Sequence, residues 1–215
     1  MAITTEGVLK AVEVLKTSSP KRKFRQSVDL ALTLKELDMS KPENRINEEL
    51  VLPNGRGKEI KVGVIADGEL ALQAKKVADT VIMREELEEL AKDKKAAKKL
   101  ANGHDFFVAQ SDMMSMIGKT LGPVLGPRGK MPKPVPANAQ IAPVVERLKK
   151  TVRVKTKEKP TIHVVVGMED MEEKQLAENI ETVLRFIERK LERGMENVRS
   201  VYIKTTMGPG AKLEV

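Results

Sequence analysis

The stretch KVGVIA at residues 61–66 decides the fold, because a short apolar run of strand length is followed at once by a helical pattern. The same alternation recurs twice further along the chain. Residues 80–83 and 105–109 are predicted strands. The first precedes a long predicted helix from residue 84 to about residue 100, and the second a helical segment that starts at residue 112. Alternating strands and helices form parallel sheets with crossover helices. The sequence therefore predicts a small doubly wound, Rossmann-like α/β domain.

The two flanks of this region carry a different pattern. On the N-terminal side, Val8, Leu9, Val12 and Leu15 share one face of a predicted helix, and residues 28–34 alternate like a strand with one buried face. On the C-terminal side, residues 161–166 are a predicted strand. An apolar stripe from residue 176 to residue 191 predicts an amphipathic helix, and residues 199–205 alternate again. Together the flanks supply two helices and three strands, enough for one α+β domain.

We therefore predict a two-domain protein of mixed α/β and α+β class. Residues 1–58 and 156–215 are expected to form a discontinuous α+β domain, interrupted by an α/β domain with a parallel sheet at residues 59–155. The chain is predicted to cross between the domains at PNGRGK, residues 53–58, and in the charged run at residues 153–160. Two such crossings would form a hinge, since connections at domain boundaries are few and flexible.

Positive charge is concentrated in two places. The chain has 39 Lys and Arg residues against 31 Asp and Glu residues, a net charge of +8. Residues 113–155 contain nine basic residues and one acid, so this stretch alone nets +8 and the rest of the chain sums to zero. A second cluster, KRKFR, occupies residues 21–25. Local clusters in a balanced chain indicate contact with nucleic-acid phosphates, with a solvated face as the alternative.

Fragments that resemble enzyme motifs are incomplete. The GKT at residues 118–120 resembles the end of a phosphate-binding loop, but Met113 stands where the first glycine is required. There is no cysteine, and His104 and His163 have no partner at metal-ligand spacing. We expect no catalytic site, cofactor or metal, so a phosphate-handling enzyme is the least favoured function. No apolar run is long enough to cross a bilayer and no signal-peptide pattern is present, so we expect a cytosolic protein.

The chain has only five aromatic residues, too few for a platform that stacks bases. An RNA-binding protein of this composition must recognise backbone, 2′-hydroxyls and shape. Phe24 lies inside the basic cluster, although it could equally be the first core residue before a strand. Two Gly-Pro loops are candidate contacts, with ordinary turns as the alternative. LGPRGKMP at residues 125–132 fixes Arg128 and Lys130 between rigid turns. In TTMGPG at residues 205–210, Thr206 offers a hydrogen bond and Gly208 permits close approach of RNA.

Four motifs occur in an order that resembles one family. They are KFRQSVD at residues 23–29, LPNGRGK at 52–58, LGPRGKMP at 125–132, and SVY at 200–202 followed by TMGP at 206–209. Together they closely resemble the family of the first large-subunit ribosomal protein, which lies in the mobile side stalk beside the transfer-RNA exit site. The resemblance runs nearly end to end and is closer to the archaeal branch, since the long N-terminal lead is missing and the stretch before Ser200 is shorter. Asn54 departs from the pattern, because many members carry His there.

The resemblance implies that the terminal domain makes the main contact with large-subunit ribosomal RNA. Carried over by motif, the RNA-binding residues are Lys23, Phe24, Ser27, Asp29, Ser200, Thr206, Met207 and Gly208, with secondary contacts from Arg128 and Lys130 of the inserted domain. The resemblance also implies a role in moving or releasing exit-site transfer RNA and in repressing translation of the protein's own messenger RNA. We expect a cytoplasmic protein of the large ribosomal subunit, monomeric when free and without a membrane partner. A stand-alone messenger-RNA-binding regulator is the alternative.

Overall fold

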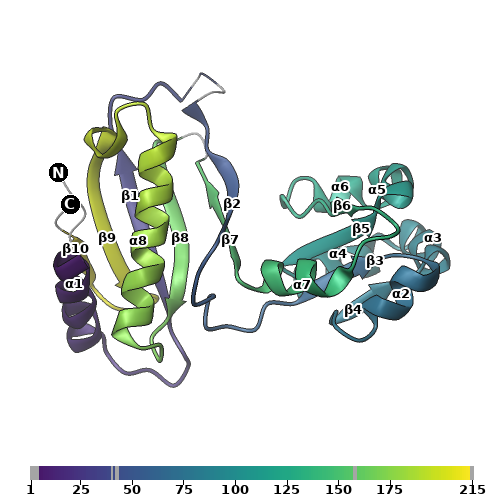
Figure 1. Ribbon diagram of the computed structural model, residues 1–215, viewed down its shortest axis with the longest axis horizontal. Coiled ribbons are helices and arrows are strands. Elements are labelled where there is room, and N and C mark those ends of the chain that lie inside the picture. Colours follow the sequence, from purple (N-terminus) through teal and green to yellow (C-terminus); the bar gives the residue numbers. More distant parts are fainter. Residues whose placement is uncertain (1–4, 40, 42–43, 157–158, 214–215) are drawn as a thin grey trace. The chain divides into compact units, whose positions relative to one another are not determined.

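The structure is a computed structural model that describes residues 5–39, 41, 44–156 and 159–213. Its contacts divide the chain into two units (Figure 1). The terminal unit consists of Met1–Lys58 and Lys150–Val215, and the inserted unit consists of Glu59–Lys149. The terminal unit has antiparallel strand pairs and the inserted unit has parallel ones, so the mixed fold class predicted from the sequence is confirmed.

The terminal unit is built on a four-stranded antiparallel sheet with the strand order β10-β9-β1-β8. A two-stranded sheet of β2 and β7 adjoins it through β8. Its elements are α1 (Thr5–Ser18), β1 (Ser27–Leu34), β2 (Asn47–Val51), β7 (Thr151–Lys155), β8 (Thr161–Met168), α8 (Glu173–Lys190), η3 (Gly194–Asn197), β9 (Val198–Thr205) and β10 (Gly210–Leu213). The central strand, β1, joins the N-terminal flank to both C-terminal strands that pair with it, so neither flank could form this sheet alone.

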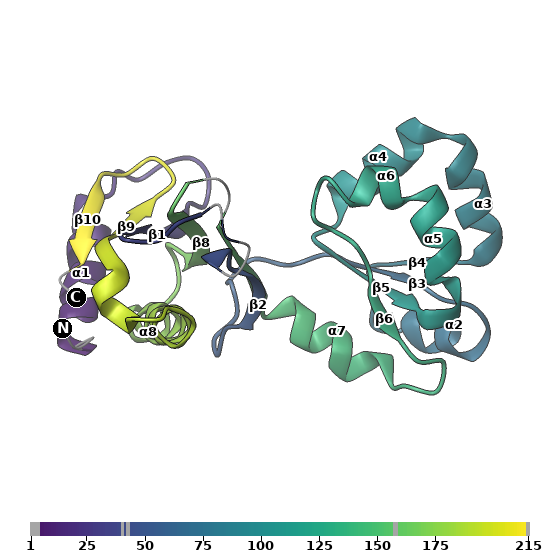
Figure 2. The same ribbon diagram turned by 90° about the horizontal axis from the view of Figure 1, so that it is seen from above.

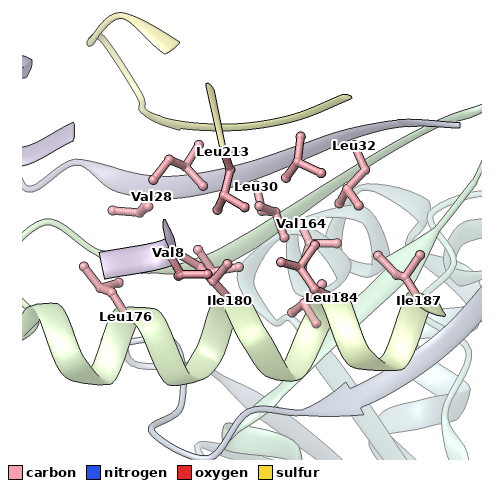
Figure 3. Packing of buried hydrophobic residues seen from close by; sticks show 14 of the residues in the cluster. Val8, Val28, Leu30, Leu32, Val164, Leu176, Ile180, Leu184, Ile187 and Leu213 are labelled. Carbon is pink, nitrogen blue, oxygen red and sulfur yellow. The ribbon is translucent and has the colours of Figure 1, made fainter. Parts of the chain in front are cut away.

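The core of the terminal unit lies on one side of its sheet. Burial alternates strictly along β1, where Val28, Leu30 and Leu32 point inward. Figure 3 shows these side chains facing the apolar stripe of α8, including Ile180 and Leu184. Helix α1 packs beside α8 on the same face (Figure 2). The opposite face of the sheet has no helix over it in the part of the unit that the structure describes, which leaves every second residue of β1 and β9 accessible.

The inserted unit is a three-layer arrangement around a parallel sheet with the strand order β4-β3-β5-β6. Side chains alternate across the sheet, so Val62 and Val64 belong to one apolar cluster with α2 and α7, whereas Ile65 belongs to another with α3 to α6. Phe107 fills the second cluster, and a Cβ on Gly63 would lie 2.7 Å from its ring. The elements are β3 (Val62–Ile65), α2 (Gly68–Ala74), β4 (Thr80–Ile82), α3 (Arg84–Lys92), α4 (Lys94–Gly103), β5 (Phe106–Gln110), η2 (Ser111–Met113), α5 (Met114–Thr120), α6 (Gly122–Leu125), β6 (Lys133–Val135) and α7 (Ile141–Lys149).

The prediction of one long helix from residue 84 to about residue 100 is wrong, because the helix is interrupted at Asp93. This residue is extended, with φ −107° and ψ 94°, and separates α3 from α4. Its carboxylate accepts a hydrogen bond from the backbone N–H of Lys95 at 2.8 Å and so caps the start of α4. A side chain that satisfies a free N–H at a helix start competes with continued helix, and the charge periodicity hid this signal.

The second predicted domain boundary is also wrong, since the unit boundary lies at 149/150 and not at 155/156. The cause is β7, which pairs with β2 of the terminal unit over its whole length, from Thr151 opposite Val51 to Lys155 opposite Asn47. The charged run at residues 153–160 therefore belongs to the end of β7 and the connection to β8, and two of its residues, 157 and 158, lie outside the described part. Residues 53–58 lie in the terminal unit, next to the boundary at 58/59.

Candidate nucleic-acid interface

Most of the predicted contact residues lie at one end of the terminal unit's sheet. Because β1 and β9 are antiparallel, the start of β1 at Ser27 lies beside the end of β9, where Val28 is opposite Thr205. The loop that carries Lys23 and Phe24 leads into this end of β1, and the TTMGPG loop leads out of β9. The fold therefore brings the first and last predicted motifs together although about 180 residues separate them in sequence.

Thr206 closes the sheet at this end through three hydrogen bonds to Ser27. The N–H of Thr206 donates to the Ser27 carbonyl at 3.1 Å, and the N–H of Ser27 donates to the Thr206 hydroxyl oxygen at 3.1 Å. The Thr206 hydroxyl also donates to the Ser27 carbonyl in a longer contact of 3.5 Å. The hydroxyl thus replaces a backbone carbonyl in the ladder while the residue remains exposed. A hydroxyl held in this way can still engage a ligand group with a fixed geometry.

Gln26 connects the whole site, and sequence analysis missed it. Its side chain is fully buried. The amide Nε2 donates to the Pro20 carbonyl and to Glu169, both at 3.0 Å, and Oε1 accepts the N–H of Met207 at 3.0 Å. Its backbone N–H also donates to Glu169. Because one buried amide joins the basic loop, the end of β8 and the TTMGPG loop, the two exposed loops have a defined relative position. A glutamine between a basic cluster and a strand carries no signal of this role.

Gly208 is required by close packing beneath the TTMGPG loop. A Cβ at this position would lie 2.2 Å from the Thr205 hydroxyl and 2.8 Å from the Ser19 hydroxyl. These two hydroxyls bond each other at 3.0 Å. Even an alanine must therefore displace the loop, since real Cβ atoms do not approach other atoms so closely. The glycine fixes the position of its neighbour Met207 as well as leaving its own backbone uncovered.

Two large apolar side chains are exposed at the site. Phe24 has 51% of its surface exposed and Met207 has 55%. The structure decides the question about Phe24, because a half-exposed side chain in a loop is not the first core residue of β1. Apolar side chains that stay exposed beside cations are typical of a binding surface and contribute contact area without being needed for folding.

The uncovered face of the sheet extends the site from this end. Asp29, at the centre, lies opposite Lys204 of β9 in the strand register. Burial raises the pKa of the Asp29 carboxyl above its usual value, although Lys204, His163 and Arg56 pull the pKa in the opposite direction. Tyr202 is 40% exposed, and Ser200 lies further along the same face of β9. The face is therefore polar and mixed in charge, with hydroxyl groups among the cations.

Arg128 and Lys130 lie in the inserted unit and donate hydrogen bonds to groups of that same unit. Arg128 donates to the Val124 carbonyl at 2.9 Å and to the Asn102 side chain at 3.2 Å. The Lys130 ammonium donates to the carbonyls of Ala101 at 2.9 Å and His104 at 2.6 Å. A cation in this position satisfies carbonyl groups at the end of α4 and interacts favourably with the helix dipole. The loop thus has a structural role that the sequence did not indicate.

The long basic stretch does not form one surface in either unit. Its residues up to Lys149 belong to the inserted unit and those from Lys150 onward to the terminal unit. On β7, Arg153 is paired with Glu49 at 2.9 Å. Nearby, Lys190 of α8 pairs with Glu48 at 2.6 Å. These pairs lower the excess positive charge around the two-stranded sheet. Net charge along the sequence therefore overstated the charge available to a polyanion here.

The enzyme-like fragments take ordinary structural roles. The GKT at residues 118–120 ends helix α5 and is no loop after a strand. His104 is buried, with Nδ1 bonded to the Leu100 carbonyl and Nε2 to the Thr80 hydroxyl. Within the described ranges, no group of three or more His, Cys, Asp and Glu side chains could hold a metal ion. No helix in the same ranges is long and apolar enough to cross a membrane.

Comparisons with known proteins match this arrangement to one family. A family model described as the ribosomal protein L1p/L10e family matches residues 14–209. The chain is 60% identical over 209 residues to the large ribosomal subunit protein uL1 of Methanothermococcus thermolithotrophicus, covering 97% of this chain and 98% of the relative. It is 58% identical to the uL1 protein of Methanothermobacter thermautotrophicus, covering 95% and 97%. The uL1 protein of Methanocaldococcus jannaschii is 52% identical, covering 97% and 95%.

Proposed function

The chain belongs to the ribosomal protein L1p/L10e family, and from this premise we propose that its terminal unit binds a folded element of large-subunit ribosomal RNA at the side stalk. As a member of this family it is a structural protein of the large ribosomal subunit in the cytoplasm and not an enzyme. The proposed contact residues are Lys23, Phe24, Ser27, Asp29, Ser200, Thr206, Met207 and Gly208.

The observation that carries the proposal is the fixed pair of loops at the end of β1 and β9. Gln26 and Thr206 hold backbone and hydroxyl groups in place, while Phe24 and Met207 remain exposed beside Lys23. A fixed constellation of this kind costs little conformational entropy on binding, so it favours one RNA shape over others. Lys23 adds attraction to phosphates, which is independent of sequence and weakens with salt. Arg128 and Lys130 have donors committed within the inserted unit, so we assign them only secondary contacts.

A salt-titrated binding assay tests this proposal with the stalk fragment of large-subunit ribosomal RNA and a scrambled hairpin of equal length. Thr206→Ala removes the hydroxyl and is expected to weaken binding to the stalk fragment by roughly ten-fold, as for one lost hydrogen bond of about 1.4 kcal/mol. Thr206→Ser keeps the hydroxyl and should restore most of the affinity. Thr182→Ala serves as the control, because that hydroxyl also bonds a backbone carbonyl but lies on α8. Equal and steeply salt-dependent binding of both RNAs would reject the proposal.

We further infer that the same surface binds the protein's own messenger RNA and represses its translation. The fixed loops recognise shape, so any RNA that folds like the ribosomal site presents the same groups to them. The stalk fragment should therefore displace the messenger leader from the protein, and Thr206→Ala should weaken both complexes by a similar factor. A messenger complex that survives saturating stalk fragment would indicate a separate site and favour a stand-alone regulator.

The role in moving or releasing exit-site transfer RNA is a third element of the proposal. The two-unit architecture supports it, since one unit can hold ribosomal RNA while the other contacts a second RNA. Ribosomes reconstituted without the protein should release deacylated transfer RNA at a different rate from complete ribosomes. An unchanged rate would remove this role and leave ribosomal-RNA binding intact.

A further inference from the structure

A cationic cavity lies at the end of the sheet opposite the fixed loops. It has a volume of about 750 Å³ and is lined by residues that follow β1, form η3, begin β9 and end β10. Its charged lining consists of Lys35, Glu36, Arg193, Glu196, Arg199 and Lys212. An eight-residue strand spans roughly 23 Å, so β9 connects this cavity to Thr206 over that distance. Figure 1 shows β9 between β10 and β1 along this path.

Three of the four cations in this cavity are available to a ligand. Lys35, Arg199 and Lys212 are exposed, and among the described residues none of their side chains has a hydrogen-bond or ion-pair partner. The fourth, Arg193, is held by Glu36 at 2.9 Å in an exposed pair. An exposed pair of this kind contributes little to stability and can exchange for a stronger anion. The situation is the reverse of that of Lys130, whose ammonium is bonded to two carbonyls of its own unit.

The cavity is continuous with the proposed RNA-binding face. Ser200 belongs both to its lining and to the uncovered face of the sheet. From Ser200, the exposed side chains of Tyr202 and Lys204 follow along β9 toward Thr206. Lys212 lies opposite Tyr202 in the register of β10 and β9. An RNA backbone that runs from the fixed loops along this face therefore passes Lys204, the Tyr202 hydroxyl and Lys212. The acidic residue beside this path is Asp29, opposite Lys204.

We propose that this cavity binds backbone phosphates of the same RNA, forming a second anchor roughly one strand length from the fixed loops. The inference rests on the proposed function and names where the RNA continues. Two unpartnered ammonium groups, a guanidinium and a hydroxyl are the donors that phosphodiesters accept from proteins. The mixed lining, with Glu36 and Glu196 present, provides a net charge of +2 from the four cations and two acids, so the anchor adds affinity without base specificity.

The test is the salt dependence of stalk-RNA binding in the full chain. The triple variant Lys35→Met, Arg199→Met and Lys212→Met should reduce the slope of log K against log salt by about 2 to 3, as for three lost phosphate contacts. Affinity at physiological salt should fall by roughly ten-fold or more for the stalk fragment and the scrambled hairpin alike. The matched control replaces Lys174, Arg185 and Arg189 with Met. These cations lie on the exposed side of α8, and their removal lowers the net charge equally.

Phosphate-ethylation interference gives an independent measurement. Wild type should show two groups of interfering phosphates, and the triple variant should lose one group while keeping the other. Glu36→Gln should act in the opposite direction and tighten binding, because it loosens the hold on Arg193.

A triple variant with the slope and interference pattern of its control would overturn the second anchor. If Thr206→Ala still weakened binding, the proposed function would stand. If neither Thr206→Ala nor the triple variant changed binding, the proposed function itself would fail. Inorganic phosphate at millimolar concentration could occupy the cavity while the triple variant keeps the wild-type salt slope for RNA binding. This result would assign the cavity to a free anion and would also overturn the proposal.

Discussion

The loop at residues 205–210 in the terminal unit and the loop at residues 125–132 in the inserted unit share glycine, proline and neighbouring methionine, yet their groups face different partners. In the first loop, internal bonds to Ser27 and Gln26 fix the backbone and leave Met207 exposed. In the second, Arg128 and Lys130 turn onto carbonyls of their own unit. The first loop has no cation and is held by neutral hydrogen bonds that leave its side chains accessible, whereas the second commits its cations to internal carbonyls.

The largest effect is expected from Gln26→Leu. The substitution removes the buried amide that joins the basic loop, Glu169 and the N–H of Met207. Leaving those groups without their partner should cost about 3 kcal/mol of the free energy of unfolding and abolish preference for the stalk RNA. Gln110→Leu is the control, since Gln110 bonds Asp67 and Asp112 in the inserted unit and is only partly buried. Urea unfolding and the binding assay measure both variants. Equal losses of stability and of RNA preference in the two variants would show that the bonds of Gln26 matter no more for binding than those of Gln110.

Gly208→Ala should have the next largest effect. The added Cβ lies 2.2 Å from the Thr205 hydroxyl, so the loop must move, and the strain is about 2 kcal/mol. Affinity for the stalk RNA should fall by more than ten-fold. Gly118→Ala makes the same chemical change on α5, where nothing lies within 4 Å, and should stabilise the protein slightly. Calorimetry measures the stability of both variants, and the binding assay measures their affinity for the stalk RNA. A Gly208→Ala variant that bound RNA as well as wild type would contradict the packing argument.

A reciprocal pair, Lys23→Met and Lys130→Met, separates the two uses of a cation. Lys130→Met should lower the stability of the inserted unit by about 1.5 kcal/mol, because the carbonyls of Ala101 and His104 lose their donor, and should change RNA affinity less than two-fold. Lys23→Met should leave stability unchanged and reduce the salt slope by about 1. Hydrogen exchange in α4 and salt-titrated binding provide the measurements. A Lys130 variant that folds normally and loses as much RNA affinity as the Lys23 variant would erase the comparison.

The smallest effect concerns Asp29 on the uncovered face. Its pKa is raised in the folded protein, so between its unfolded and folded pKa values the folded state binds more protons, and stability falls as pH rises through that window. Asp29→Asn should remove this fall and leave the protein slightly more stable than wild type at neutral pH. Urea unfolding between pH 3 and pH 7 measures the effect. A variant that loses stability at neutral pH would indicate that the electrostatic attraction from Lys204, His163 and Arg56 outweighs the cost of burial.

The periodic spacing of apolar residues was sufficient to predict the main helices and strands of both units. The alternation in β1 and the apolar stripe of α8 predicted the terminal core, and the strand at residues 61–66 with its successors predicted the parallel sheet. Periodicity failed where a single side chain decides the backbone, as at Asp93, and where a short polar strand depends on its partner, as for β7 with β2. Such features depend on contacts that local sequence does not specify.

The site residues were predicted by motif and not by physical reasoning alone. Charge density pointed to residues 113–155, where several cations are used within the protein's own structure. It did not indicate Gln26, because a buried amide that bonds three segments has no sequence pattern. It also did not indicate the cavity at Lys35 and Arg199, whose cations come together only through the antiparallel pairing of β1 and β9.

Lysine acetylation footprinting of the full chain, with and without the stalk fragment, tests most directly whether the terminal unit carries RNA binding. At an RNA concentration that saturates only the stalk complex, the stalk fragment should protect Lys23 and Lys204, and the more weakly bound scrambled hairpin should protect them less. Lys98 and Lys99, exposed on α4 of the inserted unit, should keep their reactivity in both cases. Protection of Lys98 and Lys99 by the stalk fragment, with Lys23 and Lys204 still reactive, would contradict the assignment and transfer the main contact to the inserted unit.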